Sequence, residues 1–111
     1  MPMLTRRATM AGAGAAALLA AHETQAQPAA RKTFVLIHGA YHGGWCWKYV
    51  TDILERAGHR VYAPSLTGHA DRSHLLTKDL TMDVHVADIV NLFTWEDLKD
   101  VCLVAHSFGG F

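Results

Sequence analysis

The sequence has 111 residues, which is enough for one domain at most. Half of the residues are apolar and 18% are charged, which is the balance of a folded globular protein rather than of a disordered chain. Ten basic and ten acidic side chains cancel, so no net field would gather nucleic acid or an anionic membrane, and neither is expected as a partner.

Residues 1–26 have the pattern of an export signal peptide. Arg6 and Arg7 precede the apolar stretch AGAGAAALLAA, which is shorter than the ~20 residues of a membrane-spanning helix, so no stable membrane insertion is expected. The polar stretch HETQAQ follows, with Ala26 as a cleavage point. The paired arginines resemble a twin-arginine signal, which implies export by the twin-arginine machinery to the periplasm or beyond. A disordered, Ala-rich terminus is the alternative. Residues 27–32 are then a linker.

A strand, a helix and a second strand are predicted next. The run from Phe34 to Ile37 is continuously apolar, which is typical of a strand covered on both faces. The stretch GGWCWKYVTDILERAGH predicts a helix, with Gly58 placed for its left-handed C-terminal residue. The short strand RVYAP closes at Pro64. The apolar positions at helical spacing are Cys46, Val50, Ile53, Leu54 and Ala57.

The second half of the chain repeats this order. SLTGHADRSHLLTKDL has no clean period and is predicted to be a long loop. TMDVHVADIVNLFTWEDL predicts a helix capped by Thr81, with Val86, Ile89, Val90 and Phe93 as its inner stripe. DVCLVAH predicts a third buried strand. Cys46 and Cys102 fall in apolar segments, so we interpret both as buried hydrophobic residues rather than as a disulfide.

The alternation of three strands with two helices predicts an α/β fold, a parallel sheet with right-handed crossovers and helices on both faces. Ligands bind such sheets at the carboxyl ends of the strands. The segments HGAYHGGW and AHSFGG follow the first and third strands. Topology therefore brings these two segments to the same edge of the sheet.

The segment AHSFG has the form of a nucleophile elbow, in which a serine sits on a sharp turn between a strand and a helix. Ala105 and Gly109 are small enough for such a turn. An acyl-transfer serine also needs donors for the developing oxyanion. The backbone N–H groups of Phe108 and Ala40 are the candidates, with Gly39 allowing close approach of the first loop. A Gly-rich turn with an incidental serine is the alternative.

Three segments together, FVLIHGAYHGGWCW, VYAPSLTGHADRSH and VCLVAHSFGG, resemble the α/β-hydrolase superfamily. The resemblance covers about residues 33–111 and is to the branch that holds plant methylesterases, hydroxynitrile lyases and bacterial esterases. It implies that Ser107 is the nucleophile and that Ala40 and Phe108 supply the oxyanion N–H groups. The pair Gly39-Ala40 resembles the esterases, because the lyases usually place a threonine next to a position that lacks the glycine.

In this superfamily the acid and the histidine of the triad follow the serine, and no histidine follows Ser107 here. The upstream histidines are poor substitutes: His38 should lie beneath the oxyanion loop, His42 lacks a carboxylate partner and His106 should face away. We therefore expect residues 33–111 to be a truncated α/β-hydrolase domain, its C-terminal part absent, and inactive alone.

The expected function of the full-length protein is hydrolysis of small apolar carboxylic esters through an acyl-enzyme, without a cofactor. A non-catalytic domain that binds a small ligand is the alternative. A zinc site from His69, Asp71 and His74 is not expected, because these residues share one loop with no second ligand cluster.

Overall fold

The computed structural model describes residues 30–111. The predicted signal peptide over residues 1–26 and the start of the linker lie outside the described residues. Within residues 30–111, no helix combines the length and apolar character needed to cross a membrane.

The elements follow the predicted order. The first strand ends where the polar segment HGAYHGGW begins, and the third ends just before Ser107. A short 3-10 helix precedes the first α-helix, so that helix begins later than the pattern indicated. The elements are β1 (Thr33–Ile37), η1 (Gly44–Trp47), α2 (Lys48–Arg56), β2 (Arg60–Tyr62), η2 (Ala70–Leu75), α3 (Met82–Trp95), β3 (Val101–Ala105) and η3 (Ser107–Gly110).

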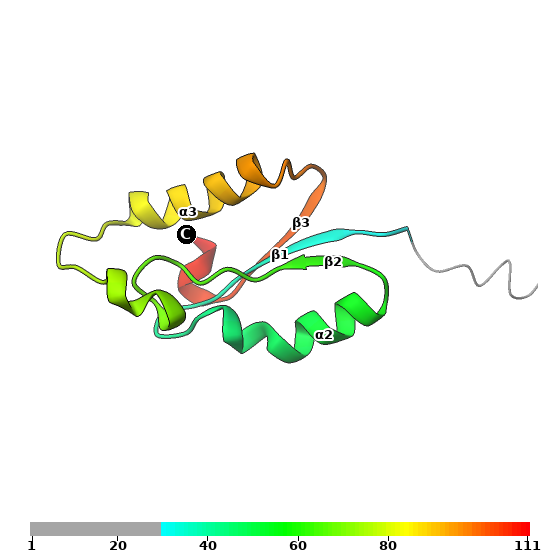
Figure 1. Ribbon diagram of the computed structural model, residues 1–111, viewed down its shortest axis with the longest axis horizontal. Helices are drawn as coiled ribbons and strands as arrows, with labels where there is room; N and C mark the ends of the chain where they lie inside the picture. Colours follow the sequence, from blue (N-terminus) through cyan, green and yellow to red (C-terminus); the bar gives the residue numbers. More distant parts are fainter. Residues whose placement is uncertain (1–29) are drawn as a thin grey trace, which may run out of the picture. The chain divides into compact units, whose positions relative to one another are not determined.

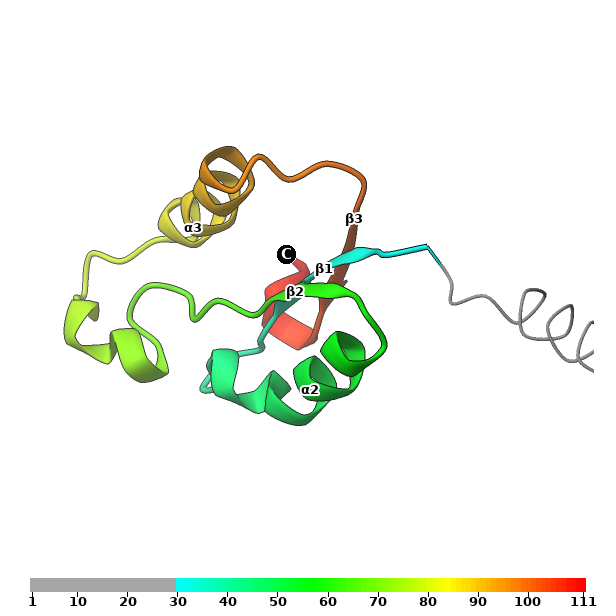
Figure 2. The same ribbon diagram turned by 45° about the vertical axis from the view of Figure 1, so that its right-hand side comes forward.

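The three strands form one parallel sheet in the order β2-β1-β3. Thr33 pairs with Arg60 on one side of β1, and Ile37 pairs with Ala105 on the other. Helices α2 and α3 lie on opposite sides of the sheet in both views (Figure 1, Figure 2). The prediction of three parallel strands with crossover helices is confirmed.

The core lies between the sheet and α3. Val35 and Ile37 of β1 pack with Leu66, which follows β2, and all three are buried. Ile89 and Phe93 of α3 pack against this cluster. The core therefore joins β1 to the loop after β2, and these are the two segments that approach the predicted site.

Three predictions about burial are wrong: that β3 is buried, that Cys46 and Cys102 are both buried, and that Val86 and Val90 face the core. β3 is not buried along its length, since Cys102 is exposed and Leu103 is 55% exposed. Val86 and Val90 in the predicted inner stripe of α3 are 47% and 55% exposed. The reason is that β3 is an edge strand with β1 as its single neighbour, so the apolar surfaces beside its outer edge have no partner in residues 30–111. Both cysteines are free thiols, as expected.

Two local predictions also need correction. The segment after β2 is not a plain loop, because residues Ala70–Leu75 form the 3-10 helix η2. Thr81 is the N-cap residue of α3, as predicted, but its side chain makes no capping hydrogen bond. Gly58 has a φ of 92° just after α2, the left-handed conformation expected of a glycine that ends a helix.

Candidate active site

Ser107 occupies a strained turn at the carboxyl end of β3. Its φ is 52°, in the left-handed region that residues other than glycine rarely adopt. The residue is exposed, and it directly precedes Phe108 in η3. Strain of this kind persists only where the surrounding structure enforces it. The sharp strand-to-helix turn expected of the segment AHSFG is therefore present, with the serine outside the core.

Two glycines make this turn compatible with its neighbours. A Cβ on Gly109 would lie 2.6 Å from the carbonyl oxygen of His38, closer than real Cβ atoms come to other atoms. A Cβ on Gly39 would lie 2.9 Å from Nδ1 of His106 and 3.3 Å from Cβ of Ser107. Gly39 therefore lies directly beside the serine, and the convergence of the two strand-end segments predicted from topology is confirmed.

We call residues 39–44 the oxyanion loop, after its predicted role. Ala40 is exposed, and its backbone N–H has no hydrogen-bond acceptor among residues 30–111. The N–H of Phe108 likewise has no acceptor among those residues. Tyr41 has a φ of 62°, so the loop contains a strained residue of its own. The loop and the elbow thus present two free amides on adjoining segments, while the roles of Ala40 and Phe108 stay predictions.

His38 lies beneath the oxyanion loop. Its side chain is fully buried, Nδ1 lies 2.7 Å from the carbonyl oxygen of Gly39, and Nε2 lies 2.9 Å from the backbone nitrogen of Leu66. The N–H of Leu66 can only donate and the carbonyl oxygen of Gly39 can only accept. The ring is therefore neutral, with its proton on Nδ1. Burial lowers the pKa of His38, which stabilises this neutral form. The histidine therefore joins the loop to the segment after β2.

The segment after β2 is itself fastened to α3. Asp88 accepts hydrogen bonds of 2.7 Å from the backbone N–H and from the hydroxyl of Thr67. Arg72 bridges the same carboxylate, at 3.4 Å, and the carbonyl oxygen of Ser65, at 3.2 Å. Sequence reasoning missed Ser65, Arg72 and Asp88, because their contacts join parts of the chain that share no period.

Three further histidines lie near the elbow. His42 stacks on His106 with ring centroids 6.0 Å apart, and His85 meets the Phe108 ring edge-on at 5.7 Å. Within residues 30–111, no side chain hydrogen bonds to the Ser107 hydroxyl. That range also holds no group of three histidine, cysteine or acidic side chains arranged to bind a metal.

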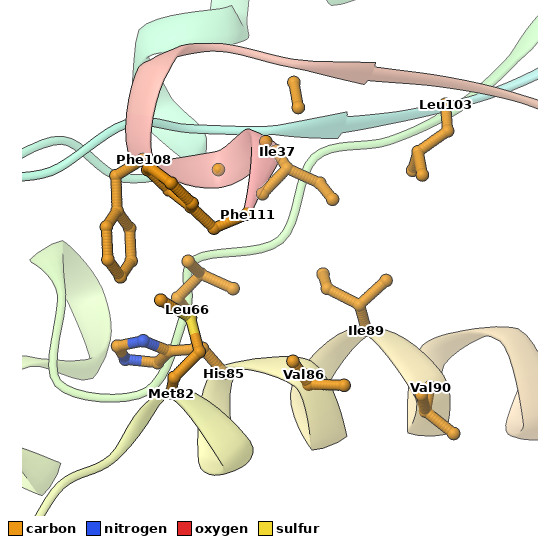
Figure 3. Close-up of a pocket in the computed structure, with 13 residues that line it drawn as sticks. Ile37, Leu66, Met82, His85, Val86, Ile89, Val90, Leu103, Phe108 and Phe111 are labelled. Atoms are coloured by element: carbon orange, nitrogen blue, oxygen red, sulfur yellow. The ribbon is translucent and has the colours of Figure 1, made fainter.

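An apolar cavity of about 280 Å³ lies beside the elbow. Met82, Val86 and Ile89 of α3 line one wall, while Ile37 and Leu103 come from the strands (Figure 3). Phe108 and His85 lie together at one end (Figure 3). The lining of this cavity is thus mostly apolar, with His85 as its single titratable side chain.

The comparisons with known proteins agree with this fold. The model of the alpha/beta hydrolase family matches residues 34–111, which is most of the chain. The chain belongs to the α/β-hydrolase family. A carbendazim-hydrolysing esterase of Nocardioides is 47% identical over 77 residues, which cover 69% of this chain and 32% of the relative. Methylesterase 2 of Arabidopsis thaliana is 40% identical over 72% of this chain and 31% of the relative.

Solved structures are similar to this chain as well. An extracellular α/β-hydrolase from a Paenibacillus species superposes with a TM-score of 0.65 at 35% identity, over 71% of this chain and 31% of that one. Polyneuridine aldehyde esterase superposes with a TM-score of 0.64 at 31% identity, over 72% of this chain and 32% of that one. The α/β-hydrolase chain described here therefore spans about a third of the length of the esterases that it matches.

Proposed function

We propose that the protein to which this chain belongs is a serine hydrolase that cleaves carboxylic esters through an acyl-enzyme. The observation that carries the proposal is the strained, exposed Ser107, which lies beside Gly39 at the carboxyl edge of the sheet. Its relatives include esterases of bacteria and plants, which supports ester hydrolysis as the general reaction.

In the proposed mechanism the Ser107 hydroxyl attacks the ester carbonyl and the alcohol leaves, after which water releases the acid. The N–H groups of Ala40 and Phe108 hold the negative oxygen of each tetrahedral intermediate. Both amides are free of acceptors among the described residues, so neither must break a bond to serve. Removing one such donor from a serine hydrolase costs roughly 10²–10³ in rate.

A histidine that takes the proton from Ser107, and an acid that orients it, are expected in a part of the whole protein outside this chain. No described side chain bonds to the Ser107 hydroxyl, which supports that expectation. Loss of the histidine of such a triad alone lowers the rate by about 10⁶. Residues 33–111 by themselves should then be inactive.

The proposed substrates are small apolar esters. The esterase relatives support small esters as the general substrate class. The proposed reaction needs neither a metal nor an organic cofactor, since backbone N–H groups provide the charge stabilisation.

The test is a comparison of Ser107→Ala with the unchanged complete protein. We expect the variant to lose hydrolysis of a short-chain aryl ester by a factor of about 10⁴–10⁶ and to lose labelling by a fluorophosphonate. Ser73→Ala is the matched control, since Ser73 is exposed in the same domain and its side chain makes no hydrogen bond there. Equal hydrolysis and equal labelling in Ser107→Ala would exclude the nucleophile assignment, whereas neither hydrolysis nor labelling in the unchanged protein would favour a domain that only binds a ligand.

A further inference from the structure

The oxyanion loop is anchored at both of its ends by the segment that follows β2. At the first end, the buried His38 bonds to the carbonyl oxygen of Gly39 and to the backbone N–H of Leu66. At the second end, the backbone N–H of Gly44 donates a hydrogen bond of 2.9 Å to Oγ of Ser65. Ala40 lies between these two anchors, so the position of its N–H depends on both.

The hydrogen bonds at the second anchor have defined donors and acceptors. Ser65 is 7% exposed, and its hydroxyl donates a hydrogen bond to the carboxylate of Asp71. A serine hydroxyl carries one proton, so donation to Asp71 leaves its lone pairs for the Gly44 N–H. The hydrogen bond from Ser65 is also the main reason that the pKa of Asp71 is lowered. Asp71 is therefore ionised at neutral pH and accepts the hydrogen bond from Ser65. This bond fixes which way the Ser65 lone pairs face the loop.

Packing prevents the Gly44 end of the loop from moving toward Ala63, and the hydrogen bond to Ser65 opposes movement of that end away from it. A Cβ on Gly44 would lie 2.2 Å from the carbonyl oxygen of Ala63, so this end of the loop packs against the residue that follows β2. It has no room to move inward. The hydrogen bond to Ser65 opposes movement outward. Such movement would otherwise be favoured, because it would relieve the backbone strain at the left-handed Tyr41.

We propose that Ser65 is a positioning residue for the oxyanion loop, and that Asp71 orients it. The proposal rests on the proposed esterase function and adds to it a residue that touches neither substrate nor nucleophile. Ser65 would act through Gly44, holding the Ala40 N–H where the negative oxygen develops. A donor displaced by a fraction of an ångström still allows substrate to bind but stabilises the transition state less.

The experiment uses five variants of the complete protein: Ser65→Ala, Asp71→Ala, Asp71→Asn, and the controls Ser73→Ala and Asp79→Asn. Both control residues are exposed and lie in the same segment. Active sites are counted with a fluorophosphonate, and kcat is expressed per counted site. Affinity is measured for an aryl trifluoromethyl ketone, which adds reversibly to the nucleophile and places a negative oxygen in the oxyanion site.

We expect Ser65→Ala to lower kcat per site by about 10- to 30-fold, which is less than loss of a whole donor, with KM changed by less than about threefold. Affinity for the ketone should fall by a similar factor. Asp71→Ala should give a smaller loss. Asp71→Asn should stay close to the unchanged protein, because an amide oxygen still accepts from Ser65. Both controls should be unchanged.

A purely structural role would give a different pattern. Ser65→Ala would then lower the melting temperature and the fraction of active sites, but leave kcat per site and ketone affinity unchanged, and the proposal would be wrong. If Ser65→Ala does not fold, the exposed Asp71 still decides, since equal kcat per site in Asp71→Ala and Asp71→Asn would overturn the proposal.

Failure of the esterase function itself would appear separately, as neither ester hydrolysis nor fluorophosphonate labelling in the unchanged complete protein. The anchor would even then be measurable by hydrogen exchange. The Gly44 amide should exchange at least about tenfold faster in Ser65→Ala than in Ser73→Ala, because it loses its acceptor in the first variant alone. Equal exchange at Gly44 in the two variants would remove the physical basis of the proposal.

Discussion

Nε2 of His38 accepts a hydrogen bond of 2.9 Å from the backbone N–H of Leu66, and this bond joins the end of β1 to the segment after β2. Both residues are buried. The bond exists only while Nε2 is unprotonated, since a protonated ring has no lone pair to accept it. The attachment of the oxyanion loop is therefore sensitive to pH.

The first prediction concerns this sensitivity. The pKa of His38 is lowered in the folded state, whereas in the unfolded state a histidine has a pKa of about 6.5. The unfolded state therefore binds the proton more readily. The contribution of neutral His38 to the free energy of unfolding should be fully present above about pH 7 and should fall as the pH drops below about 6.5. His38→Gln, which cannot titrate, should remove this part of the pH dependence at a constant cost of about 1 kcal/mol for the altered hydrogen bonds.

Urea unfolding of the complete protein between pH 5 and pH 8 measures this effect. The control is His74→Gln, because His74 is exposed and makes no side-chain hydrogen bond within residues 30–111. If His38→Gln and His74→Gln had parallel stability curves over this range, the neutral, buried state of His38 would be excluded.

The second prediction concerns the two neighbouring glycines of the elbow. Gly109→Ala should destabilise the protein by about 1–3 kcal/mol, because its new methyl group would meet the carbonyl oxygen of His38 at 2.6 Å. Gly110→Ala is the matched control, since a Cβ there has no neighbour within 4 Å in the described residues. Thermal unfolding compares the two, and equal melting temperatures would contradict the close packing of the elbow on β1.

The third prediction separates a half-buried ion pair from a surface one. Asp88→Ala should cost about 2–4 kcal/mol, because Thr67 and Arg72 would lose a common, largely buried partner. Asp52→Ala removes the exposed pair with Arg56 and should change stability by less than about 0.5 kcal/mol. Chemical denaturation of both variants measures the difference. Similar small losses would mean that Asp88 does not fasten the segment to α3.

The fourth prediction concerns the proposed export. Residues 1–32 fused to a reporter protein should direct it to the periplasm or the medium, and the double change Arg6→Lys and Arg7→Lys should abolish that export. Lysines keep the positive charge, so a loss would come from the arginine pair itself. Fractionation and immunoblotting measure the distribution. Undiminished export of the double variant would argue against the twin-arginine route.

The sequence alone determined the order of the elements, the parallel sheet and the meeting of the two strand-end segments. Apolar runs, helical spacing and the alternation of strands with helices are local patterns, and each follows from backbone geometry over a few residues. The position of Ser107 at the sheet edge was predictable for the same reason, since a strand, a small residue and a glycine stand in sequence around it.

Only the tertiary structure decided how the loop beside that serine is held. The bonds of Ser65 to Gly44 and of Leu66 to His38 join residues 21 and 28 positions apart, and no sequence period links them. It also decided burial at β3, because an apolar pattern states what a strand can bury and not whether a neighbour covers it. Hydrogen bonds across the fold depend on the packing of whole elements, which the order of the residues does not specify by itself.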